Sequence, residues 1–111
     1  MRKGNVIAIA TARAKARTRQ EWEKAVEGVW ADAVRELRAN AGFMGLLALW
    51  NNDDSRQASV IGVWDTMEHR MAYEARSSTY VRGLFNAIFE EVPQRPRWII
   101  TKARLQDKPT S

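Results

Sequence analysis

The chain has 111 residues, no cysteine and a net charge of +5. That length fits one domain, residues 1–111, with a core of its own, and a hydrophobic content of 45% excludes a disordered chain. Without cysteine there is no disulfide, thiolate nucleophile or zinc–thiolate site, which suits a cytoplasmic protein. We find no apolar run long enough for a membrane span or a secretory signal.

Basic residues gather toward the two ends of the sequence. Arg13 and Arg17 are examples near the start, and Arg97 and Arg104 are examples near the end. Such charge attracts anionic ligands or nucleic acid, but it is also typical of a plain solvated surface. Charge alone leaves both interpretations open.

Hydrophobic periodicity predicts a strand over residues 6–16 and then a long helix. Thr18 and Glu21 fit a capping box at the start of that helix, and Gly42 is suited to end it. Gly28 inside the helix is expected to allow close packing on the sheet. An apolar stripe with the 3.6-residue helical period runs between the ends: Trp22, Ala25, Val26, Val29, Trp30, Ala33, Val34 and Leu37.

Residues 43–51 and 57–64 are predicted to form a hairpin, joined by a polar turn over residues 51–55. Both strands carry apolar side chains on both faces. In the first strand Leu47 and Leu49 oppose Leu46, Ala48 and Trp50, and in the second Val60 and Trp64 oppose Ile61 and Val63.

Two short helices and a last strand complete the chain. The first of these helices begins at Asp65 or Thr66, where Asp65 and Glu68 fit a second capping box. Residues 77 and 78 are serines that cap the next helix, and prolines end the helical part. We expect a strand over residues 97–105 and a polar tail over 106–111. The predicted apolar positions are Met67, Met71, Ala72 and Ala75 in one helix, and Tyr80, Leu84, Phe85, Ile88 and Phe89 in the other.

This order of elements predicts an α+β domain of ferredoxin-like βαββαβ topology. Right-handed crossovers place the helices on one face of a four-stranded antiparallel sheet. The other face would then expose more apolar surface than a monomer usually tolerates. A second copy packed on it by two-fold symmetry would bury that surface, so we expect a homodimeric α/β barrel.

Four short patterns in residues 41–91 carry a resemblance to a known family. They are Gly42-Phe43-x-Gly45, the acidic turn at residues 53–54, Trp64 followed by an acidic and a hydroxyl residue, and a serine three residues before Tyr80. In these features the sequence resembles the antibiotic biosynthesis monooxygenase family of dimeric α/β barrels. With the first strand and helix, the resemblance covers almost the whole chain, and it specifies fold more than chemistry.

The resemblance implies oxygenation of an aromatic phenol or quinol without metal, flavin or haem. An electron-rich phenolate can pass an electron to dioxygen itself, so the protein supplies an apolar pocket, a route for the phenol proton and a dipole for the developing charge. One histidine and no clustered carboxylates make a protein metal site unexpected. We therefore expect neither a cofactor nor a metal.

The same resemblance suggests roles for particular residues. Trp64 would help to hold the ligand, Tyr73 would orient it, and His69, the one histidine, would accept a proton near neutral pH. Trp30, Trp50 and Phe85 would line the pocket together with Trp64 and Tyr73. Structural alternatives exist for each: a core tryptophan whose N–H finds a carbonyl, a helix-edge tyrosine, a solvent-exposed histidine and plain core aromatics. Arg82 would either meet an anionic ligand or lie exposed on its helix.

The sequence also departs from the family. Val60 stands where relatives carry an asparagine, and valine cannot bond a substrate carbonyl. Haem-degrading relatives need an Asn–Trp–His set, and here Gly83 or Leu84 falls near the place of that histidine. We therefore expect no haem degradation.

Two other functions compete with the oxygenase. One is a small-molecule-binding barrel without catalysis, built on the same pocket. The other is RNA binding, because RNA recognition motifs share this topology, but those motifs stack bases on exposed aromatics of their central strands. The segments VIAIAT and QASVIGVW offer no such pair, so we expect no nucleic-acid partner.

Overall fold

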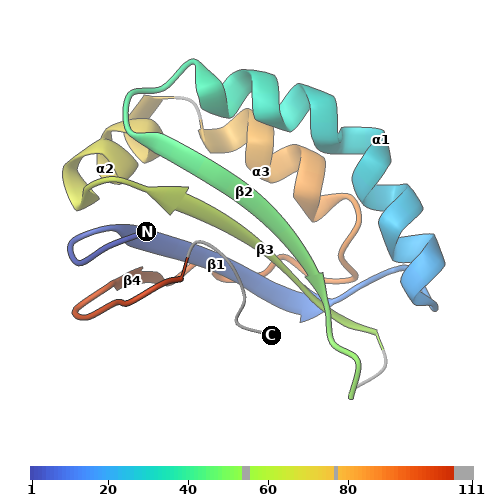
Figure 1. Ribbon diagram of the computed structural model, residues 1–111. Helices are drawn as coiled ribbons and strands as arrows, with labels where there is room; N and C mark the ends of the chain where they lie inside the picture. Colours follow the sequence, from blue (N-terminus) through green and yellow to red (C-terminus); the bar gives the residue numbers. More distant parts are fainter. Residues whose placement is uncertain (54–55, 77, 107–111) are drawn as a thin grey trace.

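The computed structural model describes residues 1–53, 56–76 and 78–106. It contains a four-stranded sheet of order β2-β3-β1-β4, and the helices cover one face of it (Figure 1). The elements are β1 (Val6–Arg13), α1 (Arg19–Arg38), β2 (Phe43–Trp50), β3 (Gln57–Trp64), α2 (Met67–Arg76), α3 (Ser78–Asn86) and β4 (Arg97–Ile99). The predicted ferredoxin-like α+β fold is confirmed. Within the described residues no helix combines the length and the hydropathy needed to cross a membrane.

Some predicted features lie outside the described residues. These are Asp54 and Ser55 of the polar turn, Ser77 and residues 107–111 of the tail.

The first and the last strand of the chain are both shorter than predicted, because each runs out of partner. β1 ends at Arg13, opposite Gln57, where β3 begins, and Ala14 forms an isolated bridge with Phe89. β4 ends at Ile99, opposite Val6 at the start of β1. The prediction of a final strand over residues 97–105 was therefore wrong after residue 99.

The start of α1 carries the predicted cap, with one change. The Glu21 amide donates to Thr18 Oγ1 at 3.2 Å, as a capping box requires. The Glu21 carboxylate, however, accepts from the amide of Arg17 at 2.8 Å, one residue before the expected donor. The predicted apolar stripe is confirmed, and its buried members are Trp22, Val26, Ala33 and Leu37.

The two glycines singled out from the sequence play opposite parts. Gly28 is exposed, and a Cβ there would meet nothing within 4 Å, so the predicted close packing at Gly28 was wrong. Gly42 has φ +85, and a Cβ there would lie 2.6 Å from the Cβ of His69 and overlap the Asp65 carboxylate. Gly42 is thus required both by backbone conformation and by the start of α2 packed against it.

The buried side of α2 differs from the prediction. The helix buries Arg70 and Tyr73, whereas Met71 is 50% exposed and Ala72 and Ala75 are exposed. Arginine can lie against the sheet because its stem is apolar and its guanidinium stacks on aromatic rings. The α2 cap also differs: the amide of His69 bonds Thr66 Oγ1 at 3.1 Å.

The buried side of α3 is shifted by one residue. Val81 and Phe85 face the core, and Tyr80 is 48% exposed. Ser78 Oγ donates to the carbonyl of Glu74 at 3.1 Å, which ties the start of α3 to the end of α2. α3 ends at residue 86, so Phe89 is buried as part of the following segment and not of a helix.

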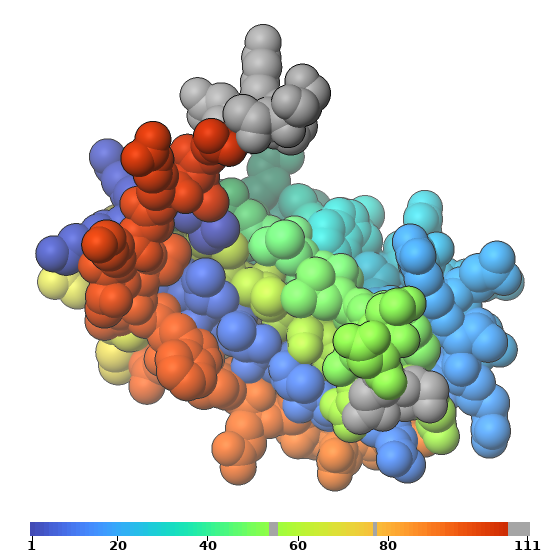
Figure 2. Space-filling view, turned by 60° about the horizontal axis from the view of Figure 1, so that its bottom comes forward, coloured from blue at the N-terminus to red at the C-terminus, as the bar shows by residue number. Residues whose placement is uncertain are grey.

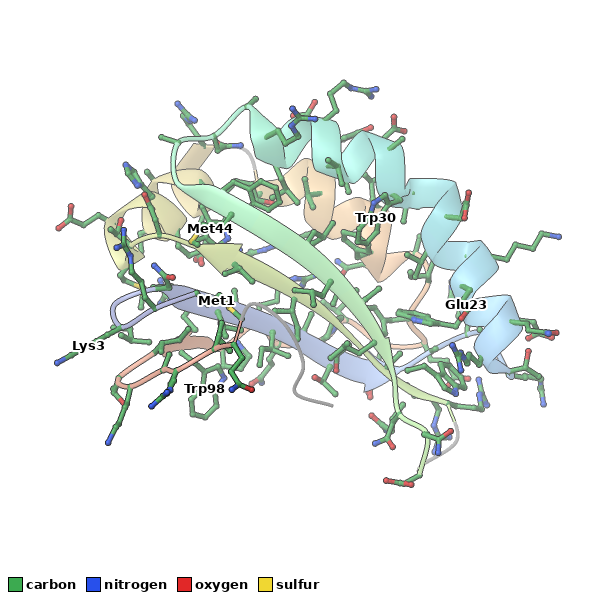
Figure 3. All side chains as sticks on the ribbon, viewed as in Figure 1. Met1, Lys3, Glu23, Trp30, Met44 and Trp98 are labelled. Carbon is green, nitrogen blue, oxygen red and sulfur yellow. The ribbon has the colours of Figure 1, made fainter. Side chains whose placement is uncertain are left out.

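The other face of the sheet is apolar and carries no helix. The register aligns Ile9, Ile61 and Leu47 in one row across it, and Trp98, Ile7 and Val63 in another. Figure 2 turns this side forward, with β3 in yellow-green between β1 in blue and β2 in green. Trp98, which is 60% exposed, projects from β4 away from the helices (Figure 3).

The two glycines give a matched pair of stability tests. Gly42→Ala should lower the free energy of unfolding by at least about 1–2 kcal/mol, the cost of a left-handed L-residue, with the contact to α2 added. Gly28→Ala should raise it by roughly 0.5–1 kcal/mol, because alanine is the better helix former. Urea unfolding of both variants measures these effects, and equal changes in the two would contradict the assignment.

Candidate functional site

A small cavity of about 40 Å³ lies between the sheet and the pair α2 and α3. Its sheet side is made of short side chains, and its helix side carries a tyrosine and two arginines; a third arginine comes from the segment after α3. The lining residues are Ala8, Ala10, Leu37, Leu46, Val60, Gly62, Arg70, Tyr73, Val81, Arg82, Phe85 and Arg95.

The cavity lies where two neighbouring strands, β1 and β3, present the small residues Ala8, Ala10 and Gly62. Gly62 of β3 pairs with Ala8 of β1 and with Leu46 of β2. A Cβ at Gly62 would lie 3.2 Å from Trp64 Nε1 and 3.7 Å from Arg70 Nη1. Glycine at position 62 therefore leaves no side chain between the β3 backbone and these two polar groups.

Trp64 and Tyr73 form the aromatic wall beside this cavity. Their rings stack with centroids 4.9 Å apart and planes at 29°, and Phe43 packs on the other side of Trp64 at 5.5 Å. Trp64 is fully buried, yet its indole Nε1 has no hydrogen-bond partner in the part of the chain that is described. The alternative in which this N–H bonds a carbonyl is thus not the arrangement seen, and a ligand oxygen could accept from it.

The surroundings of Tyr73 keep its hydroxyl protonated at neutral pH. Burial raises its pKa above the ordinary 10.0, against the opposing charges of Arg70, Arg82 and Arg95. Tyr73 is therefore equipped to donate a hydrogen bond to a ligand oxygen and is a poor acceptor for a proton.

Arginines surround this tyrosine. Arg70 is 5% exposed, its Nε donates to Glu74 Oε2 at 2.7 Å, and its guanidinium lies 5.8 Å from the Trp64 ring centroid and 5.1 Å from that of Tyr73. Arg82 approaches the second Glu74 oxygen at 3.8 Å. Arg95 donates to Asn86 Oδ1 at 2.8 Å and to the carbonyl of Pro93 at 3.3 Å. Burial lowers the pKa of Arg95, and the charges of Arg82 and Arg70 lower it further.

His69 lies apart from the cavity, at the start of α2 beside Gly42. Its Nδ1 is 2.7 Å from Asp65 Oδ1, and both side chains are about two-fifths exposed, at 44% and 41%. The hydrogen bond from His69 lowers the pKa of the Asp65 carboxyl below its ordinary 3.8. His69 does not line the cavity.

The predicted pocket residues divide between two places. Tyr73 and Phe85 line the cavity and Trp64 lies beside it. Trp30 and Trp50 instead line an open groove of about 780 Å³ between α1 and β2, together with Trp22; Figure 3 labels Trp30 and Glu23 on the α1 side of this groove. Two charged side chains of the groove, Arg19 and Glu23, pair with each other at 2.9 Å, and Glu27 and Asn52 also line it.

Sequence reasoning missed Arg70, Arg95 and Gly62, and it left Arg82 undecided. A signal for Arg70 was present: Arg70 and Tyr73 are three residues apart and Glu74 is four from Arg70, so a paired arginine and an aromatic share one side of α2. No local signal marked Arg95, which reaches the site only through the path of the chain after α3.

Among residues 1–53, 56–76 and 78–106, no three His, Asp or Glu side chains come close enough together to hold a metal ion. The donors in and beside the cavity are an indole N–H, a phenol and guanidinium groups.

Comparison with known proteins supports the fold. No family model matches the sequence, and no curated protein sequence matches it. The chain is similar in structure to the ActVA-Orf6 monooxygenase of Streptomyces coelicolor, solved in complex with nanaomycin D. That match has a TM-score of 0.71 at 17% identity and covers 95% of this chain and 94% of the other.

Two further structures resemble the chain. SnoaB, a cofactor-independent oxygenase from Streptomyces nogalater, matches with a TM-score of 0.62 at 13% identity, over 95% of this chain and 99% of its own. A candidate antibiotic biosynthesis monooxygenase from Bordetella bronchiseptica matches with a TM-score of 0.66 at 18% identity, over 86% and 96%. The chain therefore has the fold of the antibiotic biosynthesis monooxygenases.

Proposed function

We propose that this protein is a cofactor-independent monooxygenase that oxidises a small aromatic phenol or quinol with dioxygen. The observation that carries the proposal is the buried Trp64 Nε1, unpartnered in the described chain, beside a protonated Tyr73 and a mostly apolar cavity. Fold similarity to a protein named as a cofactor-independent oxygenase supports this proposal, but a shared fold does not by itself establish a shared reaction.

The proposed reaction balances without an external reductant. For 1-naphthol, one oxygen atom of dioxygen replaces the ring hydrogen para to the hydroxyl, and the products are 1,4-naphthoquinone and water. One C–O bond forms while the ring C–H, the phenol O–H and the O–O bonds break, and the two hydrogen atoms leave with one oxygen atom as water. The ring supplies four electrons, and the two oxygen atoms take them up.

The cavity residues would act on this reaction through charge. Trp64 and Tyr73 would donate hydrogen bonds to the substrate oxygen, and Arg82 and Arg95 would favour its phenolate form, because a nearby positive charge lowers the pKa of an acidic group. Phenolate formation is the step that makes the ring electron-rich. His69 stays a predicted proton acceptor, and its position outside the cavity lining means that a proton would reach it only after leaving the cavity.

A binding protein without catalysis is the second candidate. It needs no complete enclosure of a reacting ring, and the cavity volume of about 40 Å³ is well below the roughly 150 Å³ of an engineered cavity that takes benzene. An aromatic ring would enter only with movement of the side chains around the cavity.

We further propose that the apolar sheet face pairs with a second copy of the chain. Leu47 and Leu49 are each 44% exposed on β2. Leu47 continues the row formed by Ile61 and Ile9 on the neighbouring strands, whereas Leu49 lies beside the hydrogen-bonded pair of Ser59 and Thr11. Two such faces packed by a two-fold axis would bury these rows against each other. Apolar continuity across three strands supports this pairing over an open sheet in water.

Oxygen uptake tests the proposed reaction. With 1-naphthol the protein should consume dioxygen faster than buffer, with 1,4-naphthoquinone as product. Tyr73→Phe should slow the uptake about tenfold or more, since a lost hydrogen bond to a charged oxygen is worth roughly 1.5–3 kcal/mol. His69→Gln tests the proton acceptor, and Tyr80→Phe, on the exposed side of α3, is the matched control. Equal uptake with and without protein would leave only the binding role.

Light scattering at micromolar concentration tests the pairing. We expect twice the 12.7 kDa mass of one chain. Leu47→Asp should shift the protein toward monomer, because it would bury a charge in the interface. Val92→Asp is the control, since Val92 is 71% exposed outside the sheet. A wild-type mass of one chain would refute the dimer.

A further inference from the structure

The charges around the cavity do not balance. Arg70, Arg82 and Arg95 all line it. Among the described residues, the carboxylate that pairs with arginines of this group is that of Glu74. Glu74 bonds Arg70 closely, at 2.7 Å, and lies 3.8 Å from Arg82. Three guanidinium groups thus face one carboxylate in a partly desolvated place, where unpaired charge is costly.

Two of these arginines also separate the cavity from a hollow on the surface. The hollow, of about 620 Å³, lies between α3 and the segment that follows it, and Arg82 and Arg95 line both spaces. Arg82 and Arg95 therefore stand at the mouth through which a ligand would pass.

Neither arginine has a strong anionic partner in the described chain. Arg95 is held by two neutral acceptors, the Asn86 amide oxygen and the Pro93 carbonyl. Arg82 Nε is buried and has no hydrogen-bond partner there. A guanidinium group presents a planar fork of donors that matches a carboxylate in bidentate geometry, and neutral acceptors can be exchanged for such a ligand without breaking an ion pair.

We propose that the ligand of this site is an aromatic carboxylate, whose carboxylate group is held at the mouth by Arg82 and Arg95 while its ring extends toward Tyr73 and Phe85. The apolar floor of Ala8 and Ala10 suits the ring. A carboxylate is charged before it binds, so it meets the excess positive charge directly, whereas a neutral phenol must first lose a proton. This inference deepens the proposed function by adding a carboxylate group to the phenol or quinol that serves as substrate, and it rests on that function in taking the ligand to be aromatic.

Calorimetric titration at pH 7 tests the proposal with three probes of similar shape: 2-naphthoate, its neutral isostere 2-naphthamide, and 2-naphthol. 2-Naphthoate should bind at least 10-fold more tightly than 2-naphthamide, as expected for hydrogen bonds to a charged group. 2-Naphthol distinguishes a phenol from a carboxylate as the group recognised, and it should bind no better than 2-naphthamide.

Arg82→Gln and Arg95→Gln should each reduce the preference for 2-naphthoate by about 10-fold. Arg35→Gln is the control, because Arg35 lies on α1 with its side chain 68% exposed and pairs with Asp32; it should leave the preference unchanged. Circular dichroism checks that the variants fold, and the comparison of 2-naphthoate with 2-naphthamide in the wild type needs no variant.

Equal affinity for 2-naphthoate and 2-naphthamide, binding of neither, or a preference that survives both arginine variants would overturn the proposal. Failure of the two proposals can be told apart. Arginine-dependent binding of 2-naphthoate without any oxygen uptake would refute the oxygenase proposal and support the carboxylate site. Oxygen uptake with 1-naphthol but no preference for 2-naphthoate would support the oxygenase proposal and refute the carboxylate site.

Discussion

The stack of Trp64, Tyr73 and Arg70 holds the site together. Trp64 is fixed on β3, Tyr73 and Arg70 come from one side of α2, and the three are joined by ring stacking at 4.9 Å and by a guanidinium 5.1–5.8 Å from both rings. Glu74 completes the arrangement by pairing with Arg70. A cation–π contact gains strength when it is desolvated. This contact therefore allows α2 to turn Arg70 toward the sheet, although arginine is usually found on the solvent side of a helix.

The site follows from the way this stack meets a floor of small side chains. Ala8, Ala10 and Gly62 leave space next to the indole N–H and the guanidinium groups, while the larger core residues Trp22 and Phe89 pack against each other elsewhere, 5.6 Å apart. A buried donor without a partner costs roughly 1–3 kcal/mol. Trp64 Nε1 and Arg82 Nε both carry that cost, which a ligand with acceptor oxygens would relieve.

Much of the fold could be predicted from residue patterns, and part of the site could not. The α1 stripe and its Thr18 cap, the hairpin and the left-handed backbone of Gly42 depend on local periodicity and backbone conformation. The helix itself, however, ends at Arg38, four residues before Gly42. Strand ends were overextended, since a strand ends where its neighbour does and that depends on contacts distant in sequence. The buried side of α2 was predicted wrongly, because apolar Met71 was expected in the core and charged Arg70 was not. The position of Arg95 at the cavity could not be predicted, since it depends on the route of the chain after α3.

The central claim is that ligands bind beside Trp64 and not in the groove lined by Trp22, Trp30 and Trp50. The protein has five tryptophans, each with an indole N–H that gives its own signal in a ¹H–¹⁵N spectrum, and Trp→Phe variants assign them. Titration with 1-naphthol under nitrogen should move the Trp64 indole signal most, because its N–H gains an acceptor. An unmoved Trp64 signal, with the largest change at Trp30 or Trp50, would contradict the account.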